Sequence, residues 1–191
     1  MSERAILHID MNNFYASVEC MLNPDLKKYP IAVCGSQAKA FGVSTGEAIW
    51  QAKQKCPDLV TVPPHYEQYM RFSKLAREIY GRYTDLVEPF GMDEVWADVT
   101  GCQHFIGSPL HIAEEIKETV KYELGLTVSI GVSFNKIFAK LGSDMKKPDA
   151  ITVIPKESFK EKIWDLPATD MLGVGRATEK KLSSVGIHTI G

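Results

Sequence analysis

The sequence predicts an α+β fold in which a small split βαβ sheet is covered by helices on one face. Two observations lead to this prediction. Short apolar runs alternate along the chain with longer segments in which apolar residues recur every three or four positions. The first pattern is typical of buried strands and the second of amphipathic helices. A chain of 191 residues is long enough for one such core with smaller appendages.

Each expected element has its own local signal. Asn12 or Asn13 can cap a helix that follows the first strand and ends near Pro24. The longest helix places Phe72 and Ile79 on one face. Strands are expected at 5–9, 31–34, 126–132 and 151–154, with a hairpin at 85–100, and helices at 13–23, 48–57, 66–83, 109–123 and 135–145.

The charge distribution bears on the choice of partner. A net charge of −2 argues mildly against a nucleic-acid-binding protein, because such domains usually carry a basic surplus. The charge is uneven, however, with ten Lys and Arg against seven Asp and Glu from residue 136 to the end. If DNA is a partner, its phosphates should contact this C-terminal third.

Targeting signals and cysteine motifs are both missing from the sequence. Charged residues interrupt every apolar stretch well before ~18 residues, and the N-terminus lacks the pattern of a signal peptide. The four cysteines are far apart with no CxxC pair, so we expect ordinary thiols. We therefore expect a cytoplasmic protein with no membrane association.

Three carboxylates are candidates for a metal site. Asp10 stands where a strand ends and a helix begins, and the pair Asp93-Glu94 lies in the expected hairpin. If the two strands are neighbours, the three carboxylates share one edge of the sheet. Such a cluster is tolerated mainly when a cation neutralises it, and oxygen ligands suit Mg²⁺. Considered alone, an Asp-Glu pair in a turn is more often solvated.

The helix after Asp10 strengthens the metal interpretation. Its free amides at Asn13, Phe14 and Tyr15 point to where a phosphate chain would lie, because a helix N-terminus is an anion site. A metal beside a phosphate site implies phosphoryl or nucleotidyl transfer.

Several strings in one order resemble the motifs of Y-family DNA polymerases, the DinB, DNA polymerase IV and UmuC-like enzymes. The first is HIDMNNFYASVE at 8–19, followed by NPDLKKYPIAV. The later strings are AKAFGVSTGEAIWQAK, GMDEVWADVT, GVSFNKIFAKLGSDMKKP and LGVGRATEKKLSSVGI. The resemblance spans almost the whole chain.

The resemblance implies a metal-dependent nucleotidyltransferase. Asp10, Asp93 and Glu94 match the metal-binding carboxylates, with the Met11 carbonyl as a further ligand for two Mg²⁺ ions. The implied activity is template-directed DNA synthesis of the low-fidelity translesion class, used in the response to DNA damage. The implied partners are primer-template DNA and deoxynucleoside triphosphates.

The resemblance also implies nucleotide-binding residues. Tyr15 matches an aromatic steric gate under the sugar, and Phe14 would pack beside it; ordinary helix packing is the alternative for both. Lys39 and Lys147 match positions that grip the triphosphate, although surface lysines are common. Gly46 matches a small residue over the nascent base pair, which would leave the site open and lower its fidelity.

A glycine-containing segment near the C-terminus resembles a helix-hairpin-helix. Gly173 and Gly175 would let backbone amides approach a DNA phosphate, while Arg176, Lys180 and Lys181 supply positive charge. The alternative is a simple turn between helices.

The family pattern divides the chain into three parts. The palm would comprise residues 1–13 and 65–154, the fingers 14–64, and a partial helical thumb 155–191. The palm sheet would be the ferredoxin-like split βαβ unit. A sliding clamp would be contacted only through a C-terminal part that this chain lacks.

One segment departs from the pattern. Between Gln37 and Ala38 the family usually has roughly a dozen more residues, which touch the triphosphate. Either the deletion is genuine, which would impair nucleotide binding, or a loop has been omitted from the sequence. The close fit of both flanks favours omission.

Two other functions are compatible with parts of the pattern. A nucleotide cyclase also sets metal-binding carboxylates on a small sheet, but it has no use for a glycine hairpin with a basic helix. A DNA-binding or regulatory relative with impaired catalysis is the other. The complete acidic triad argues against that relative and the shortened fingers argue for it.

Overall fold

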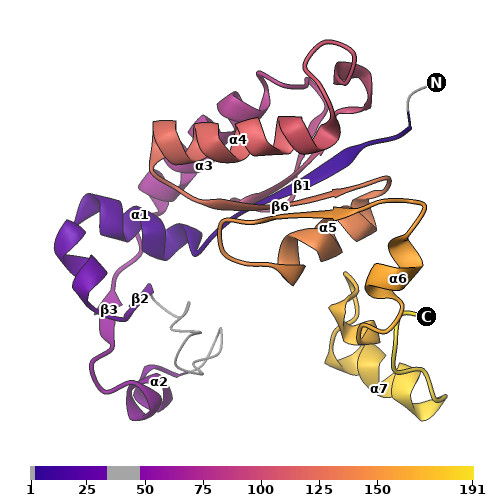
Figure 1. The fold of residues 1–191 in the computed structure, drawn as a ribbon. Helices are drawn as coiled ribbons and strands as arrows, with labels where there is room; N and C mark the ends of the chain where they lie inside the picture. Colours follow the sequence, from indigo (N-terminus) through magenta and orange to yellow (C-terminus); the bar gives the residue numbers. More distant parts are fainter. Residues whose placement is uncertain (1–2, 34–47) are drawn as a thin grey trace.

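A five-stranded mixed sheet lies at the centre of the computed structural model, which describes residues 3–33 and 48–191 (Figure 1). The strand order is β4-β5-β1-β6-β7. β1 is antiparallel to both of its neighbours, whereas β6 and β7 are parallel. The strands are β1 (Ile6–Met11), β4 (Val87–Pro89), β5 (Glu94–Asp98), β6 (Val128–Ser133) and β7 (Ile151–Ile154).

Two long helices, α3 (Tyr66–Tyr80) and α4 (Pro109–Leu124), cover one face of the sheet. They pack over Leu7, Ile9 and Met11 of β1, which point to this face in the alternation of a strand. α4 has clear end signals: Ser108 accepts a hydrogen bond from the His111 amide, and Gly125 ends the helix in the left-handed region. The main hydrophobic core therefore lies between these helices and the sheet.

The helix α5 (Lys136–Met145) packs on the opposite face, so the expectation that helices cover only one face is wrong. Its N-terminus is capped by Asn135, whose side chain accepts from the Phe138 amide at 2.8 Å. Gly131 of β6 allows the close approach, because a Cβ there would lie 1.8 Å from the Ala139 carbonyl oxygen. Helical periodicity predicts an apolar stripe but not which face of the sheet it covers.

A smaller lobe follows β1, on the α5 side of the sheet (Figure 1). It contains α1 (Phe14–Leu22), the 3₁₀ helix η1 (Pro24–Lys28), and α2 (Ile49–Lys55). Its two short strands, β2 (Ile31–Val33) and β3 (Val60–Val62), are parallel. β3 was not expected from the sequence, since three residues next to prolines are too few to show a strand pattern.

The C-terminal part packs against α5 and β7 through Ile163, which joins Leu141 and Ile154 in a small buried cluster. It contains α6 (Phe159–Ile163), the 3₁₀ helix η4 (Ala168–Asp170) and α7 (Arg176–Ser184). The element directly before the glycine segment is η4, which has only three residues and is not the full first helix that a helix-hairpin-helix requires. The helix-hairpin-helix therefore remains a prediction.

Among the residues that the structure describes, the remaining expected helices and strands agree with it apart from their ends. The hairpin at 85–100 is the antiparallel pair β4 and β5, and the 3₁₀ helix η3 (Thr100–Cys102) follows it. The predicted α+β class is confirmed. Within the described residues, no helix is both long enough and apolar enough to cross a bilayer.

The fit of α5 against the sheet can be tested with Gly131→Ala. We expect this substitution to lower the free energy of unfolding by roughly 3 kcal/mol, because the new methyl group overlaps helix backbone that cannot rotate away. Urea unfolding followed by circular dichroism measures the loss. Gly101→Ala is the control, since a Cβ there meets no atom within 4 Å. Equal midpoints for the two variants would contradict the packing described above.

Candidate active site

The carboxylates of interest meet where β1 and β5 run side by side. Asp10 of β1 is the direct register partner of Glu94 in β5. Asp93 precedes Glu94, and its carbonyl oxygen accepts a hydrogen bond from the Met11 amide at 2.9 Å. The structure thus brings together the strand end and the hairpin that carry the predicted ligands.

Two lysines from the α5 segment neutralise this edge of the sheet. The Lys147 Nζ lies 2.6 Å from Asp10 Oδ2 and 2.8 Å from Asp144 Oδ1. The Lys140 Nζ lies 3.0 Å from Glu94 Oε2 and 3.5 Å from Asp10 Oδ2. Lys147 was predicted as a triphosphate ligand, whereas Lys140 was not singled out. Its spacing of seven residues from Lys147 was an available signal.

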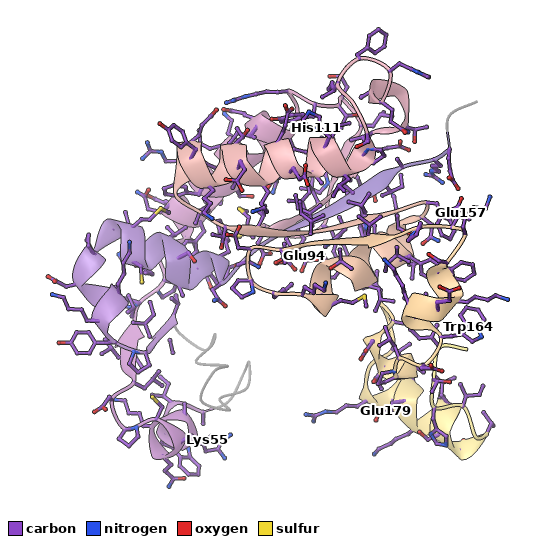
Figure 2. The ribbon with its side chains drawn as sticks, in the orientation of Figure 1. Lys55, Glu94, His111, Glu157, Trp164 and Glu179 are labelled. Carbon is purple, nitrogen blue, oxygen red and sulfur yellow. The ribbon has the colours of Figure 1, made fainter. Side chains whose placement is uncertain are left out.

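A buried histidine holds Glu94 from the other side. His8 is completely buried, and its Nε2 lies 3.2 Å from Glu94 Oε2. Its Nδ1 lies 2.8 Å from the Ser143 hydroxyl of α5. Glu94 thus lies between β1 and α5, as Figure 2 shows. His8 was also missed from the sequence, although it stands two residues before Asp10 and so on the same side of the strand.

Neighbouring carboxylates of the site differ in their electrostatics. Burial raises the pKa of Asp93 above its ordinary value, and the negative charge of Asp10 raises it further. Burial acts on Glu94 in the same direction, but the close approach of His8 and Lys140 outweighs it and lowers its pKa. Burial alone would lower the pKa of Lys147, yet hydrogen bonds to Asp10 and Asp144 raise it. Asp93 is therefore the carboxylate whose negative charge is least compensated.

The turn before Asp93 is held by α3. The Ser73 hydroxyl donates to the Met92 carbonyl oxygen. Arg77 donates to the Ser73 hydroxyl at 2.8 Å and to the Gly91 carbonyl oxygen at 3.3 Å. Asp93 is consequently tied to two elements, since its own carbonyl is bound to β1.

The predicted aromatic pair separates into one half-buried and one buried ring. Tyr15 stacks on Tyr69 of α3 with ring centroids 4.4 Å apart, and its hydroxyl donates to the Met92 sulfur at 3.5 Å. Burial and then the charge of Asp93 raise the pKa of the Tyr15 phenol, so it remains a neutral donor. Phe14 is only 3% exposed and belongs to the main core. Its placement favours the packing alternative over contact with a nucleotide.

Asn13 and Asn12 connect β1 to α1 in different ways. Asn13 is the N-cap of α1 in the left-handed region, with φ of 44°, and its carbonyl oxygen accepts from the Ser17 amide. Asn12 donates from its side chain to the Ser129 hydroxyl and accepts from the Asp149 amide. Asn12 therefore fastens the end of β1 to β6 and to the segment that carries Lys147.

The predicted DNA-binding residues lie apart from the carboxylates. Gly173 has φ of 88°, and Gly175 is the N-cap of α7. Arg176, Lys180 and Lys181 are exposed on that helix, which Figure 2 marks by Glu179. Lys39, Gly46 and the junction of Gln37 with Ala38 lie outside the described residues.

The donor chemistry of the edge fits a hard divalent cation, because its candidate ligands are carboxylate and carbonyl oxygens. In residues 3–33 and 48–191, however, no three His, Cys, Asp or Glu side chains form a group that could hold a metal ion. The ammonium groups of Lys140 and Lys147 take up the negative charge instead. A bound cation would have to replace these ion pairs at Asp10 and Glu94.

A family comparison agrees with this arrangement. Residues 9–144 match the model of the impB/mucB/samB family, and this segment contains all three carboxylates and Lys140. The protein belongs to the impB/mucB/samB family.

Individual members of the family extend the match. The DNA polymerase IV of Acetivibrio thermocellus is 54% identical over 99% of this chain and 51% of its own length. The DNA polymerase IV 1 of Bacillus subtilis is 43% identical over 98% of this chain and 48% of its own length. The chain thus spans about half the length of these curated relatives. The predicted resemblance is confirmed.

Solved structures of this family show the same fold. The crystal structure of DinB from Sulfolobus solfataricus matches 97% of this chain and 58% of that one, with 27% identity and a TM-score of 0.87. The insertion ternary complex of Dbh DNA polymerase also matches 97% of this chain and 58% of the polymerase chain, with 27% identity and a TM-score of 0.89.

The comparisons also bear on the shortened segment. The alignment with the Acetivibrio thermocellus relative spans 202 positions, whereas this chain has 191 residues. At least 11 positions of that alignment therefore have no residue from this chain. This agrees with the expected shortfall of roughly a dozen residues.

The uncompensated charge of Asp93 leads to a stability prediction. An acid whose pKa is raised on folding loses stability as it ionises, so Asp93→Asn should stabilise the cation-free protein above that pKa. We expect a gain of about 0.5–2 kcal/mol at pH 7, measured by urea unfolding in EDTA.

The gain should vanish at a pH below the ordinary pKa of aspartate, where both folded and unfolded states are protonated. Asp58→Asn, at an exposed position, is the matched control and should leave the free energy of unfolding within about 0.5 kcal/mol of the unsubstituted chain. A loss of stability in Asp93→Asn at pH 7 would contradict the electrostatic description.

Proposed function

We propose that this chain is the catalytic part of a template-directed DNA polymerase of the low-fidelity translesion class, which adds deoxynucleotides to a primer 3′-hydroxyl. The observation that carries the proposal is the meeting of Asp10 with Asp93 and Glu94 on adjacent strands, directly before the N-terminus of α1. Relatives named DNA polymerase IV support it.

The proposed cofactor is a pair of Mg²⁺ ions held by Asp10, Asp93, Glu94 and the Met11 carbonyl. When bound, such ions would favour deprotonation of the primer hydroxyl and neutralise charge on the triphosphate. The chain's own contribution is to fix the ligands: β1 and α3 hold Asp93, while His8 holds Glu94.

The nucleotide would bind beside this edge. Lys147 would exchange Asp10 for triphosphate oxygens, and the amides around Asn13 would receive the phosphate chain. Tyr15 would stand under the sugar, where its ring leaves no room for a 2′-hydroxyl. Lys39 and Gly46 remain proposed nucleotide contacts on the strength of the family motif.

The proposed division is a palm of residues 1–13 and 65–154, fingers of 14–64 and a partial thumb of 155–191. Gly173, Gly175 and the basic residues of α7 would contact the backbone of primer-template DNA. We place the protein in the cytoplasm with that DNA. A sliding clamp would bind outside this chain.

A second candidate is a DNA-binding or regulatory relative with impaired catalysis. The positions missing relative to the Acetivibrio thermocellus protein favour it, because a shortened fingers segment would weaken nucleotide binding. The family relationship favours both candidates over a nucleotide cyclase.

Single-nucleotide primer extension with Mg²⁺ separates the two candidates. We expect the chain at high concentration to add the complementary deoxynucleotide in preference to the others. Asp93→Asn should lower the rate at least about a thousandfold, or roughly 4 kcal/mol, because one ligand of the reacting centre is lost.

The same variant is expected to be more stable than the unsubstituted chain, so unfolding cannot explain its inactivity. Asp58→Asn is again the control and should retain full activity. Binding of primer-template without any extension by the unsubstituted chain would select the impaired relative.

The proposed role of α7 can be tested through salt dependence. Each phosphate contact contributes about one to the slope of log affinity against log salt, so Lys180→Ala with Lys181→Ala should flatten the slope for duplex DNA by up to about two. Fluorescence anisotropy at several salt concentrations measures the slope. The matched control is Arg71→Ala with Lys74→Ala, two exposed cations on α3. An equal slope for both double variants would remove α7 from the DNA contact.

A further inference from the structure

Glu19 of α1 is a buried carboxylate surrounded by hydrogen-bond donors. It is only 2% exposed. Its Oε1 accepts from the Tyr69 hydroxyl and from the His65 amide, the latter at 3.3 Å. The His65 ring Nδ1 lies 2.9 Å from Oε2. One side chain of α1 thus binds the first turn of α3 and the residue before it.

Packing does not fix this carboxylate on every side. Glu19 and His65 line a cavity of about 570 Å³ together with Leu22, Val62 and Gln68. The cavity lies between α1, β3 and the beginning of α3. Its presence means that hydrogen bonds, rather than close packing on that side, determine where the carboxylate sits.

Tyr69 contacts both Glu19 and Tyr15 and so links the two residues. Its side chain is fully buried, with the hydroxyl on Glu19 and the ring stacked on Tyr15 at an interplanar angle of 28°. Tyr66 contacts both rings edge-on, with centroids 6.3 Å from Tyr15 and 5.7 Å from Tyr69. Burial and the bond to Glu19 raise the pKa of the Tyr69 phenol, so this hydroxyl stays protonated and donates.

The hydrogen bond of the Tyr15 hydroxyl is weak. Its hydroxyl reaches the Met92 sulfur at 3.5 Å, and a thioether is a poor acceptor. Among its ring neighbours, Tyr15 is stacked on Tyr69 at 4.4 Å, whereas the rings of Phe14 and Tyr66 lie further away at 5.6 and 6.3 Å. We therefore take the face of Tyr69 as the main support of the Tyr15 ring plane.

We propose that Glu19 is a positioning residue for sugar selection, acting on Tyr15 through the Tyr69 hydroxyl. The inference rests on the proposed function, in which Tyr15 excludes the 2′-hydroxyl of a ribonucleotide. Steric exclusion depends on distance over fractions of an ångström, so a tilted ring admits the extra oxygen while the rest of the nucleotide still fits. A deoxynucleotide, which makes no such clash, tolerates the tilt.

The readout is the ratio of kcat/KM for a deoxynucleotide to that for the matching ribonucleotide in single-nucleotide extension. Tyr69→Phe removes only the hydroxyl, whereas Glu19→Ala removes its acceptor together with the contacts to His65. We expect each to lower the ratio about five- to tenfold, or roughly 1.0–1.4 kcal/mol, mainly by improving ribonucleotide use. Glu19→Gln keeps an acceptor for Tyr69 and should stay within about twofold of the unsubstituted chain.

A double variant and a control variant separate positioning of Tyr15 from a general loss of rigidity in the protein. If Glu19 acts through Tyr69, adding Glu19→Ala to Tyr69→Phe should cause no further fall in the ratio. Tyr83→Phe is the matched control, because its hydroxyl lies 3.1 Å from that of Thr119, away from Tyr15. It should leave the ratio unchanged.

Tyr15→Ala in the same assay distinguishes a failure of this inference from a failure of the proposed function. A collapse of the ratio in Tyr15→Ala, with no change in Tyr69→Phe and Glu19→Ala, would overturn the inference and leave the proposed function intact. An unchanged ratio in Tyr15→Ala would remove Tyr15 from the gate and overturn the inference with it. No extension by the unsubstituted chain would overturn the proposed function, and this inference with it.

Discussion

Strand β1 has a packed layer on each of its faces, and much of the structure follows from that constraint. Its odd-numbered side chains enter the core under α3 and α4, so Ile6, His8 and Asp10 must face α5. A buried carboxylate is costly unless a partner compensates its charge. The α5 segment therefore has to bring Lys140 and Lys147 to the strand. It can come close enough because Gly131 presents no side chain.

The electrostatic arrangement that results is uneven. Glu94 has two partners that favour its ionised form, whereas Asp93 is buried beside another carboxylate. The folded chain thus tolerates an unfavourable charge at one position of a site whose other charges are paired. Such a mismatch is more common at functional sites than in ordinary surface networks, because a stable fold has no need of it. The family relationship and the electrostatics therefore point to the same edge of the sheet.

Much of the fold could be predicted from local signals, and the failures have a physical cause. Helical spacing found α3 and α4 because each keeps an apolar stripe over several turns. The short apolar run before Asp10 predicted the end of β1, which lies one residue further on, at Met11. The face covered by α5 could not be predicted, since periodicity does not choose between two sides of a sheet. Glu19 was missed because its partners lie 46 and 50 residues away in sequence. Lys140 was missed because its role depends on the approach of α5.

The helix α3 has a consequence for how such a protein can change over time. Its residues Tyr69, Ser73 and Arg77 stand four apart on one side, and the first supports the Tyr15 ring while the others hold the turn before Asp93. The helix rises about 12 Å between Tyr69 and Arg77. A substitution that shifts this part of α3 therefore moves the Tyr15 ring and the turn before Asp93 together. Under the proposed function, choice of substrate and speed of reaction are then mechanically coupled traits, and selection on one of them alters the other.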